Sequence, residues 1–153
     1  MEKFSLKRCT DNQIIAEGEA ESFIKFIEDL VKKGVSLEKA RFNKVNLKGA
    51  NLKGANLKGA VFKEVYMENA NLQGAIFTWA VFKKVNMGKV DLSWANLEGA
   101  LLKGVNFEEA DLQGATIKGA IIEGVNFRKT DLREANSKGV NFRWAKIEGA
   151  IFK

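Results

Sequence analysis

The chain is predicted to be an all-β solenoid, a coil of short straight sides that follows a small N-terminal segment. Every fifth residue from Val35 to Ala150 is Ala or Val, apart from a single Thr, over 24 consecutive positions. Two places after each of these lies a larger apolar residue, from Leu37 to Phe152, with Ser137 as the one exception. The pattern also matches itself at a spacing of twenty residues.

The period of five excludes the two common regular structures. In an α-helix, residues spaced by five and by two scatter around the axis and form no apolar face. In a flat strand, residues five apart point to opposite faces. The small and large residues can both point inward in every pentad only if the chain turns a corner within each one. Such a fixed short repeat is typical of a solenoid.

The spacing of twenty predicts the shape of each coil. Among the small positions, Val recurs at intervals of twenty, at 45, 65, 85, 105 and 125. Like residues therefore stack when four pentads complete one turn, which indicates a square cross-section and about six coils for the 24 pentads. The Ala or Val at each small position lets the wall lie close to the axis, and the Leu, Phe, Ile or Met at each large position fills the interior. Short Asn and Asp side chains before the large residue are expected to bond to the backbone and to the rung above.

Residues 1–34 lie outside the repeat and are predicted to form a cap, with the solenoid occupying residues 35–153. Phe4–Arg8 and Gln13–Glu17 alternate apolar and polar residues around a turn, which indicates a β-hairpin. Ala20–Lys33 has the apolar spacing of an amphipathic helix, and Gly34 is a suitable stop. The alternative, a separate recognition module, is disfavoured because so short a segment cannot bury its own core.

The repeat resembles that of the pentapeptide-repeat family, whose pattern is A(D/N)LXX. The pattern is nearly complete in Ala50-Asn51-Leu52-Lys53-Gly54 and in the following pentad, and the resemblance extends from Val35 to Lys153. It implies a right-handed quadrilateral β-helix. Some members inhibit DNA gyrase by resembling duplex DNA in shape and negative charge, and some of these dimerise through the C-terminal end of the coil. Family membership therefore narrows the fold more than the function.

Composition argues against an enzyme. The chain has no His and one Cys, Cys9, so it lacks an imidazole base, a histidine ligand and a thiolate zinc site. Its carboxylates belong to outward positions of a convex surface, whereas acid–base catalysis requires a cleft that shifts their pKa values. We therefore predict no catalytic, cofactor or metal site and no small-molecule substrate. The single Cys and the lack of a long apolar stretch indicate a cytoplasmic protein without a membrane segment.

Charge bears on the remaining functions. The chain carries a net charge of +6, to which residues 1–34 contribute −1 and residues 35–153 contribute +7. A mimic of DNA should be negative along its length, so inhibition of gyrase is kept only as the alternative function. Direct binding of nucleic acid is also disfavoured, because Glu residues are interspersed among the Lys and Arg residues, as on an ordinary mixed-charge surface.

One outward column departs from the polar pattern and is predicted to bind a protein partner. We call it the contact strip: its apolar members, a neighbouring Trp and a basic border are Val61, Val81, Leu101, Ile121, Trp79, Lys63, Lys83 and Lys103. Contiguous exposed apolar residues usually mark a contact. The alternative is that these residues only strengthen the strands. The sequence therefore indicates a non-enzymatic scaffold for protein–protein interaction, with a partner that it does not identify.

The C-terminal coil is predicted to support a homodimer. The repeat has no covering helix after its last pentad, and its apolar residues there are Phe142, Ile147, Ile151 and Phe152. Uncovered strand edges invite pairing with another molecule, so we expect head-to-head association. The alternative is a monomer whose last coil frays.

Overall fold

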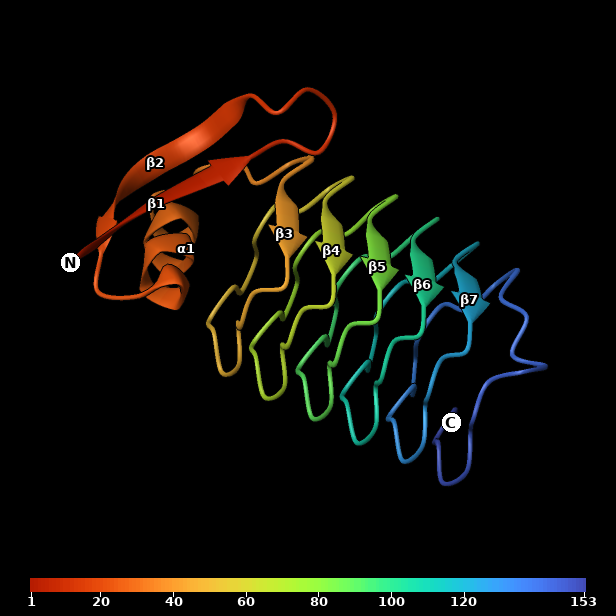
Figure 1. Ribbon diagram of the computed structural model, residues 1–153. Helices are drawn as coiled ribbons and strands as arrows, with labels where there is room; N and C mark the ends of the chain where they lie inside the picture. The colour runs from red at the N-terminus through yellow and green to blue at the C-terminus, as the bar shows by residue number, and fades with distance from the viewer.

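The computed structural model describes residues 1–153 and shows a β-solenoid preceded by a hairpin and one helix (Figure 1). The hairpin pairs β1 (Glu2–Lys7) with β2 (Ile14–Ala20) in antiparallel fashion, and the helix is α1 (Phe23–Lys32). One wall of the solenoid is a parallel sheet in the order β3 (Arg41–Asn43), β4 (Val61–Lys63), β5 (Val81–Lys83), β6 (Leu101–Lys103) and β7 (Ile121–Glu123).

Each rung of the solenoid lies over the residue twenty positions earlier. Phe42 pairs with Phe62, which pairs with Phe82, and β3 to β7 therefore span about four turns. On the other walls, isolated parallel bridges keep the same interval, as between Asn86 and Asn106. The predicted stacking at twenty residues is confirmed by this register.

The corners of the coil need a left-handed backbone. Two residues after the large inward position, φ is positive at every repeat from Lys39 to Gly149 except at Trp144. Many of these residues are glycines, for which positive φ carries no steric cost. Lys44 and Glu64 adopt it as well, both with φ of 54°, so the stacked wall imposes the turn even where a side chain opposes it.

Asn and Asp side chains close the turn before each corner. The Oδ1 atom of Asn46 accepts the backbone N–H of Lys48 at 3.0 Å, and the same bond to the residue two places on recurs along the walls. On one wall the amides also join successive rungs. Asn106 donates to Asn86 at 3.0 Å and Asn126 donates to Asn106 at 2.9 Å. Both predicted uses of these short side chains are therefore present.

The interior is a single apolar core that runs along the axis. Phe42, Phe62 and Phe82 stack with ring centroids 4.8 Å apart and are shielded from solvent. The Thr in the row of small residues, Thr130, is also buried, and its hydroxyl donates to the carbonyl of Phe107 at 2.7 Å. This bond satisfies the only polar side chain among the small inward positions.

The N-terminal segment packs on the first coil and shares its core. Leu6, Phe26 and Ile27 belong to the same buried cluster as the solenoid, and Phe23 contacts Phe42 with ring centroids 6.4 Å apart. The hairpin and helix are where the sequence predicts them, although the helix is shorter. It begins at Phe23, because the hydroxyl of Ser22 accepts the N–H of Lys25 and caps it. None of the helices in the structure could cross a membrane.

The regular sheet stops at β7. Residues 141–144 do not form a sixth strand, although bridges from Asn126 to Lys146 and from Asp131 to Ile151 continue the other walls. In Figure 1 the chain beyond β7 departs from the outline of the preceding coils. Asn141 occupies the position that the contact strip fills with Val, Leu or Ile, and its Oδ1 accepts the N–H of Arg143 at 3.0 Å. Asparagines of the other walls form the same bond and still pair with the next rung, so this bond does not account for the missing strand.

Candidate interaction surface

The four apolar members of the contact strip form one row on the outer surface of the sheet. The parallel register places Val61 beside Val81, Val81 beside Leu101, and Leu101 beside Ile121. The first three are partly buried, whereas Ile121 is 58% exposed. The row is therefore continuous, and its exposure is greatest at the strand that ends the sheet.

Trp79 lies at the corner that leads into β5. It has φ of 60° and is 64% exposed, and its ring lies over Gly99 in the next coil. A Cβ atom at Gly99 would overlap this ring. The glycine thus allows the indole to lie along the corner beside the apolar row, and the tryptophan adds aromatic surface to that side of the strip.

The basic border is a column of three like charges in adjacent strands. Lys63 pairs with Lys83 and Lys83 with Lys103 in the strand register. Lys103 forms an ion pair with Glu123 across 3.7 Å, but neither of the other two has a carboxylate partner. Like charges on neighbouring strands repel, so an acidic group placed beside Lys63 and Lys83 would relieve this repulsion.

The C-terminal residues lie together at the last coil. Phe142 is partly buried and contacts Phe127 and Phe152, with ring centroids 5.6 Å and 5.5 Å away. Phe152 is 42% exposed, and the two isoleucines, Ile147 and Ile151, are exposed to a similar degree. The structure therefore brings Phe142 and Phe152 into contact and leaves the two isoleucines exposed, and the use of these residues as a dimer interface stays a prediction.

Sequence reasoning missed further exposed aromatic residues. Trp94 is exposed and its ring lies over Gly114, which repeats the arrangement of Trp79 on another corner. Trp144 is also exposed and lies 4.9 Å from the guanidinium of Arg143. The spacing of twenty between each of the first two tryptophans and its glycine was the signal that could have revealed the pairing.

The profile for pentapeptide repeats matches this chain in eight copies, over residues 33–64, 60–99, 91–128 and 122–153. The chain belongs to the pentapeptide-repeat family. No curated protein matches it closely in sequence.

Solved structures of other pentapeptide-repeat proteins share the fold. Rfr23 from the cyanobacterium Cyanothece 51142 is 22% identical with a TM-score of 0.71, over 74% of this chain and 91% of that one. HetL from Nostoc sp. strain PCC 7120, involved in the regulation of heterocyst differentiation, is 27% identical with a TM-score of 0.54, over 76% of this chain and 57% of HetL. A protein of the Arabidopsis thaliana thylakoid lumen is 28% identical with a TM-score of 0.50, over 59% of this chain and 66% of that one.

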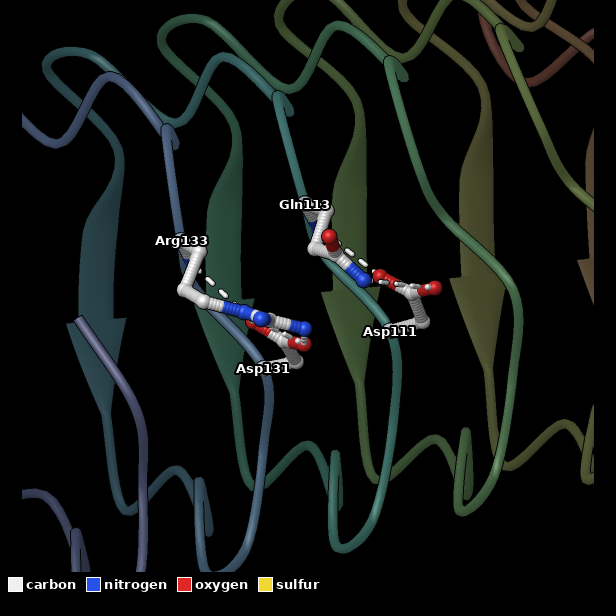
Figure 2. A network of polar contacts seen from close by, with 4 residues as sticks. All are labelled: Asp111, Gln113, Asp131 and Arg133. Carbon is white, nitrogen blue, oxygen red and sulfur yellow. Dashed lines mark hydrogen bonds and ion pairs between the residues drawn. The ribbon is translucent and has the colours of Figure 1, made fainter. Parts of the chain in front are cut away.

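This pentapeptide-repeat protein carries a short acidic row on another wall. Bridges place Asp91, Asp111 and Asp131 in successive rungs. Figure 2 shows that Gln113 bends back toward Asp111 and Arg133 toward Asp131. The hydrogen bond from Arg133, 2.6 Å between Nη2 and Oδ2, lowers the pKa of Asp131, and the same bond raises the pKa of Arg133. The row is thus neutralised at one end.

No group of three or more His, Cys, Asp or Glu side chains in the structure is arranged to hold a metal ion. The acidic row itself is a line of carboxylates along a flat wall, and each aspartate accepts the backbone N–H two residues further on. These carboxylates therefore serve the turns of the coil.

Proposed function

We propose that this protein is a non-enzymatic scaffold that binds a protein partner through the contact strip. The observation that carries the proposal is the continuous apolar row Val61, Val81, Leu101 and Ile121 beside lysines that have no carboxylate partner. Apolar surface of this kind, bordered by charge, is suited to a protein interface. The proposal includes a right-handed coil of square section with about six turns, and a cytoplasmic location.

The experiment compares variants in quantitative affinity capture from a lysate of the native host. The double variant Val81→Asn, Leu101→Asn should no longer capture the partner, because two polar side chains then interrupt the apolar row. The matched control is Tyr66→Asn combined with Ile76→Asn, which places Asn at the equivalent exposed positions of two other walls. Circular dichroism should show both variants folded. If the two variants captured equal amounts of partner, the contact strip would not be the binding surface.

We also propose homodimer formation through the last coil. Exposed Ile147, Ile151 and Phe152 supply apolar surface there, and β7 has no strand on its outer side. Light scattering coupled to gel filtration should give a dimer mass, and Ile151→Asp should reduce it to that of a monomer. A strictly monomeric wild-type protein at high concentration would reject the dimer.

The alternative function is regulation of DNA gyrase by mimicry of DNA. The acidic row is the only feature that favours it, and two observations oppose it: Asp131 is paired with Arg133, and the solenoid carries a net positive charge. An assay of gyrase supercoiling separates the two functions. The scaffold proposal predicts no inhibition, whereas inhibition that is lost on replacing Asp91 and Asp111 with Asn would favour mimicry.

A further inference from the structure

The apolar row of the contact strip runs across the strands of the sheet rather than along one of them. It takes one residue from each of four adjacent strands, and the register places Val61 beside Val81, and Leu101 beside Ile121. Adjacent strands are spaced by about 4.8 Å, so the row has this period along the axis of the coil and a length of about 14 Å. A ligand that follows the row must offer apolar side chains at a similar interval.

An α-helix meets this requirement better than an extended peptide. One face of a helix presents a side chain about every 5.4 Å, whereas one face of a strand presents a side chain about every 6.7 Å. The backbone gives a second reason. β4, β5 and β6 are hydrogen-bonded on both sides within the sheet, so an extended peptide that lay across them would find no strand edge with which to pair. A helix bonds its own backbone groups and brings only side chains to the wall.

Unpaired positive charge lies along one side of the row. Lys63 and Lys83 are exposed and have no carboxylate partner, and the same holds for Lys84 at the corner that follows. Both glutamates in these two columns of the wall are already paired with other lysines, at 4.0 Å and 3.7 Å. Carboxylates supplied by a ligand would therefore find free lysines on this side.

The other side of the row is uncharged. The corner that leads into β4–β7 carries Gly59, Trp79, Gly99 and Gly119, of which only the tryptophan has a side chain beyond hydrogen. Its indole is 64% exposed, which suits contact with an apolar or neutral flank. The net positive charge of the solenoid also favours an acidic ligand over a second copy of this chain.

We propose that the contact strip binds an amphipathic α-helix of an acidic partner, with the helix lying along the axis of the coil. The apolar stripe of the helix covers the row from Val61 to Ile121 with about three turns. Carboxylates on one flank pair with Lys63 and Lys83, and the uncharged flank lies beside Trp79. This inference rests on the proposed function, because it names the partner chemistry of the same strip.

The first test uses two synthetic helical peptides of identical composition. Each has four Leu at helical spacing and two Glu one turn apart in about 14 residues. The two Glu lie beside the Leu stripe in the first peptide and on the opposite face in the second, so only the first can place them over the lysines. Isothermal titration calorimetry should show about tenfold tighter binding of the first peptide, at about threefold for each exposed ion pair. Equal affinities, or no binding of the first peptide, would overturn the proposal.

Variants of the protein locate the peptide on the wall. The double variant Lys63→Gln, Lys83→Gln should bind the first peptide about tenfold more weakly and should no longer distinguish the two peptides. The matched control is Lys53→Gln combined with Lys58→Gln, which removes two exposed lysines at the equivalent positions of two other walls and should leave binding unchanged. Equal weakening by the two double variants would show attraction to the whole solenoid and would refute the proposed position.

The conformation of the bound peptide is a separate test. Transferred nuclear Overhauser effects should show the contacts between residues three apart that are typical of a helix. A bound peptide that is extended would contradict the argument from spacing and backbone pairing.

A last comparison separates this inference from the proposed function. The Val81→Asn, Leu101→Asn variant should lose both the first peptide and the partner captured from lysate. If it loses only the captured partner, and the wild-type protein does not bind the peptide, the strip binds a protein but not an acidic helix. If the wild-type protein fails to bind the peptide and capture does not depend on the strip, both proposals are wrong. Self-association of the wild-type protein that this variant abolishes, seen by light scattering without peptide binding, would assign the strip to a second copy of the chain.

Discussion

Replacing Gly99 with Ala tests whether the ring of Trp79 lies over that corner. Gly119 is a matched control in the same corner column, because its φ of +65° is close to the +67° of Gly99 and nothing lies within 4 Å of a Cβ atom built on it. Both substitutions place Ala in the left-handed region at a cost of roughly 1–2 kcal/mol. Only Gly99→Ala should also displace the indole, because its Cβ atom would overlap the ring.

The size of the additional effect follows from the burial of Trp79. The residue is 64% exposed, so about a third of its surface is covered by the protein. A tryptophan can bury up to about 250 Å², and a third of this area at about 25 cal/mol per Å² corresponds to roughly 2 kcal/mol. We therefore expect Gly99→Ala to lower the free energy of unfolding by roughly 2 kcal/mol more than Gly119→Ala.

Urea unfolding followed by far-UV circular dichroism measures this difference, and a Trp79→Ala background isolates its cause. Without the indole, the two glycine substitutions should become equally costly. Tryptophan fluorescence of Gly99→Ala should also report a more solvated indole. Equal losses in the wild-type background, or a difference that persists without Trp79, would refute the packing argument.

Three further substitutions test the core and the polar walls. Phe62→Ala should destabilise the protein by about 3–5 kcal/mol in urea unfolding, because it leaves a cavity in the aromatic stack. Thr130→Val should cost about 1 kcal/mol, because the buried bond to the carbonyl of Phe107 is lost. Arg133→Gln should lower the melting temperature at neutral pH. Because Arg133 lowers the pKa of Asp131 from its ordinary value of 3.8, this contribution is complete above that value and disappears as pH falls through the folded pKa.

Each of these substitutions has a control elsewhere in the coil. Phe152→Ala removes a half-exposed ring and should cost much less than the core substitution. Thr116→Val changes an outward position and should be close to neutral. Arg128→Gln removes a charge that has no ion-pair partner, so its effect on the melting temperature should be the same at neutral and at acid pH. Equal effects within any pair would contradict the role assigned to the first member.

The repeat itself predicted most of the solenoid. Val45, Val65 and Val85 recur at twenty residues, and this interval is the register found between rungs. The prediction succeeded because each pentad uses the same local turn and buries the same two inward positions. The helix start was less accurate, because Ser22 ends the extended chain by a local bond that the apolar spacing does not reveal.

The candidate surfaces were only partly predictable. The sequence aligned the contact strip in one column, since columns follow directly from the interval of twenty. It did not indicate that residues 141–144 leave the sheet, because Asn141 forms the same local turn as asparagines that stay paired on the other walls. Nor did it indicate how much of each outward side chain remains exposed.

The sequence by itself determined the period, the inward residues and the stacking of like residues at twenty, because these depend on a pattern repeated along the chain. The tertiary structure alone decided the contacts between outward side chains of neighbouring rungs. The indole of Trp79 lies over Gly99, and the buried oxygen of Glu68 lacks a donor beside Gly88. Side-chain direction and solvent exposure set these contacts, and both arise only when the coils are stacked.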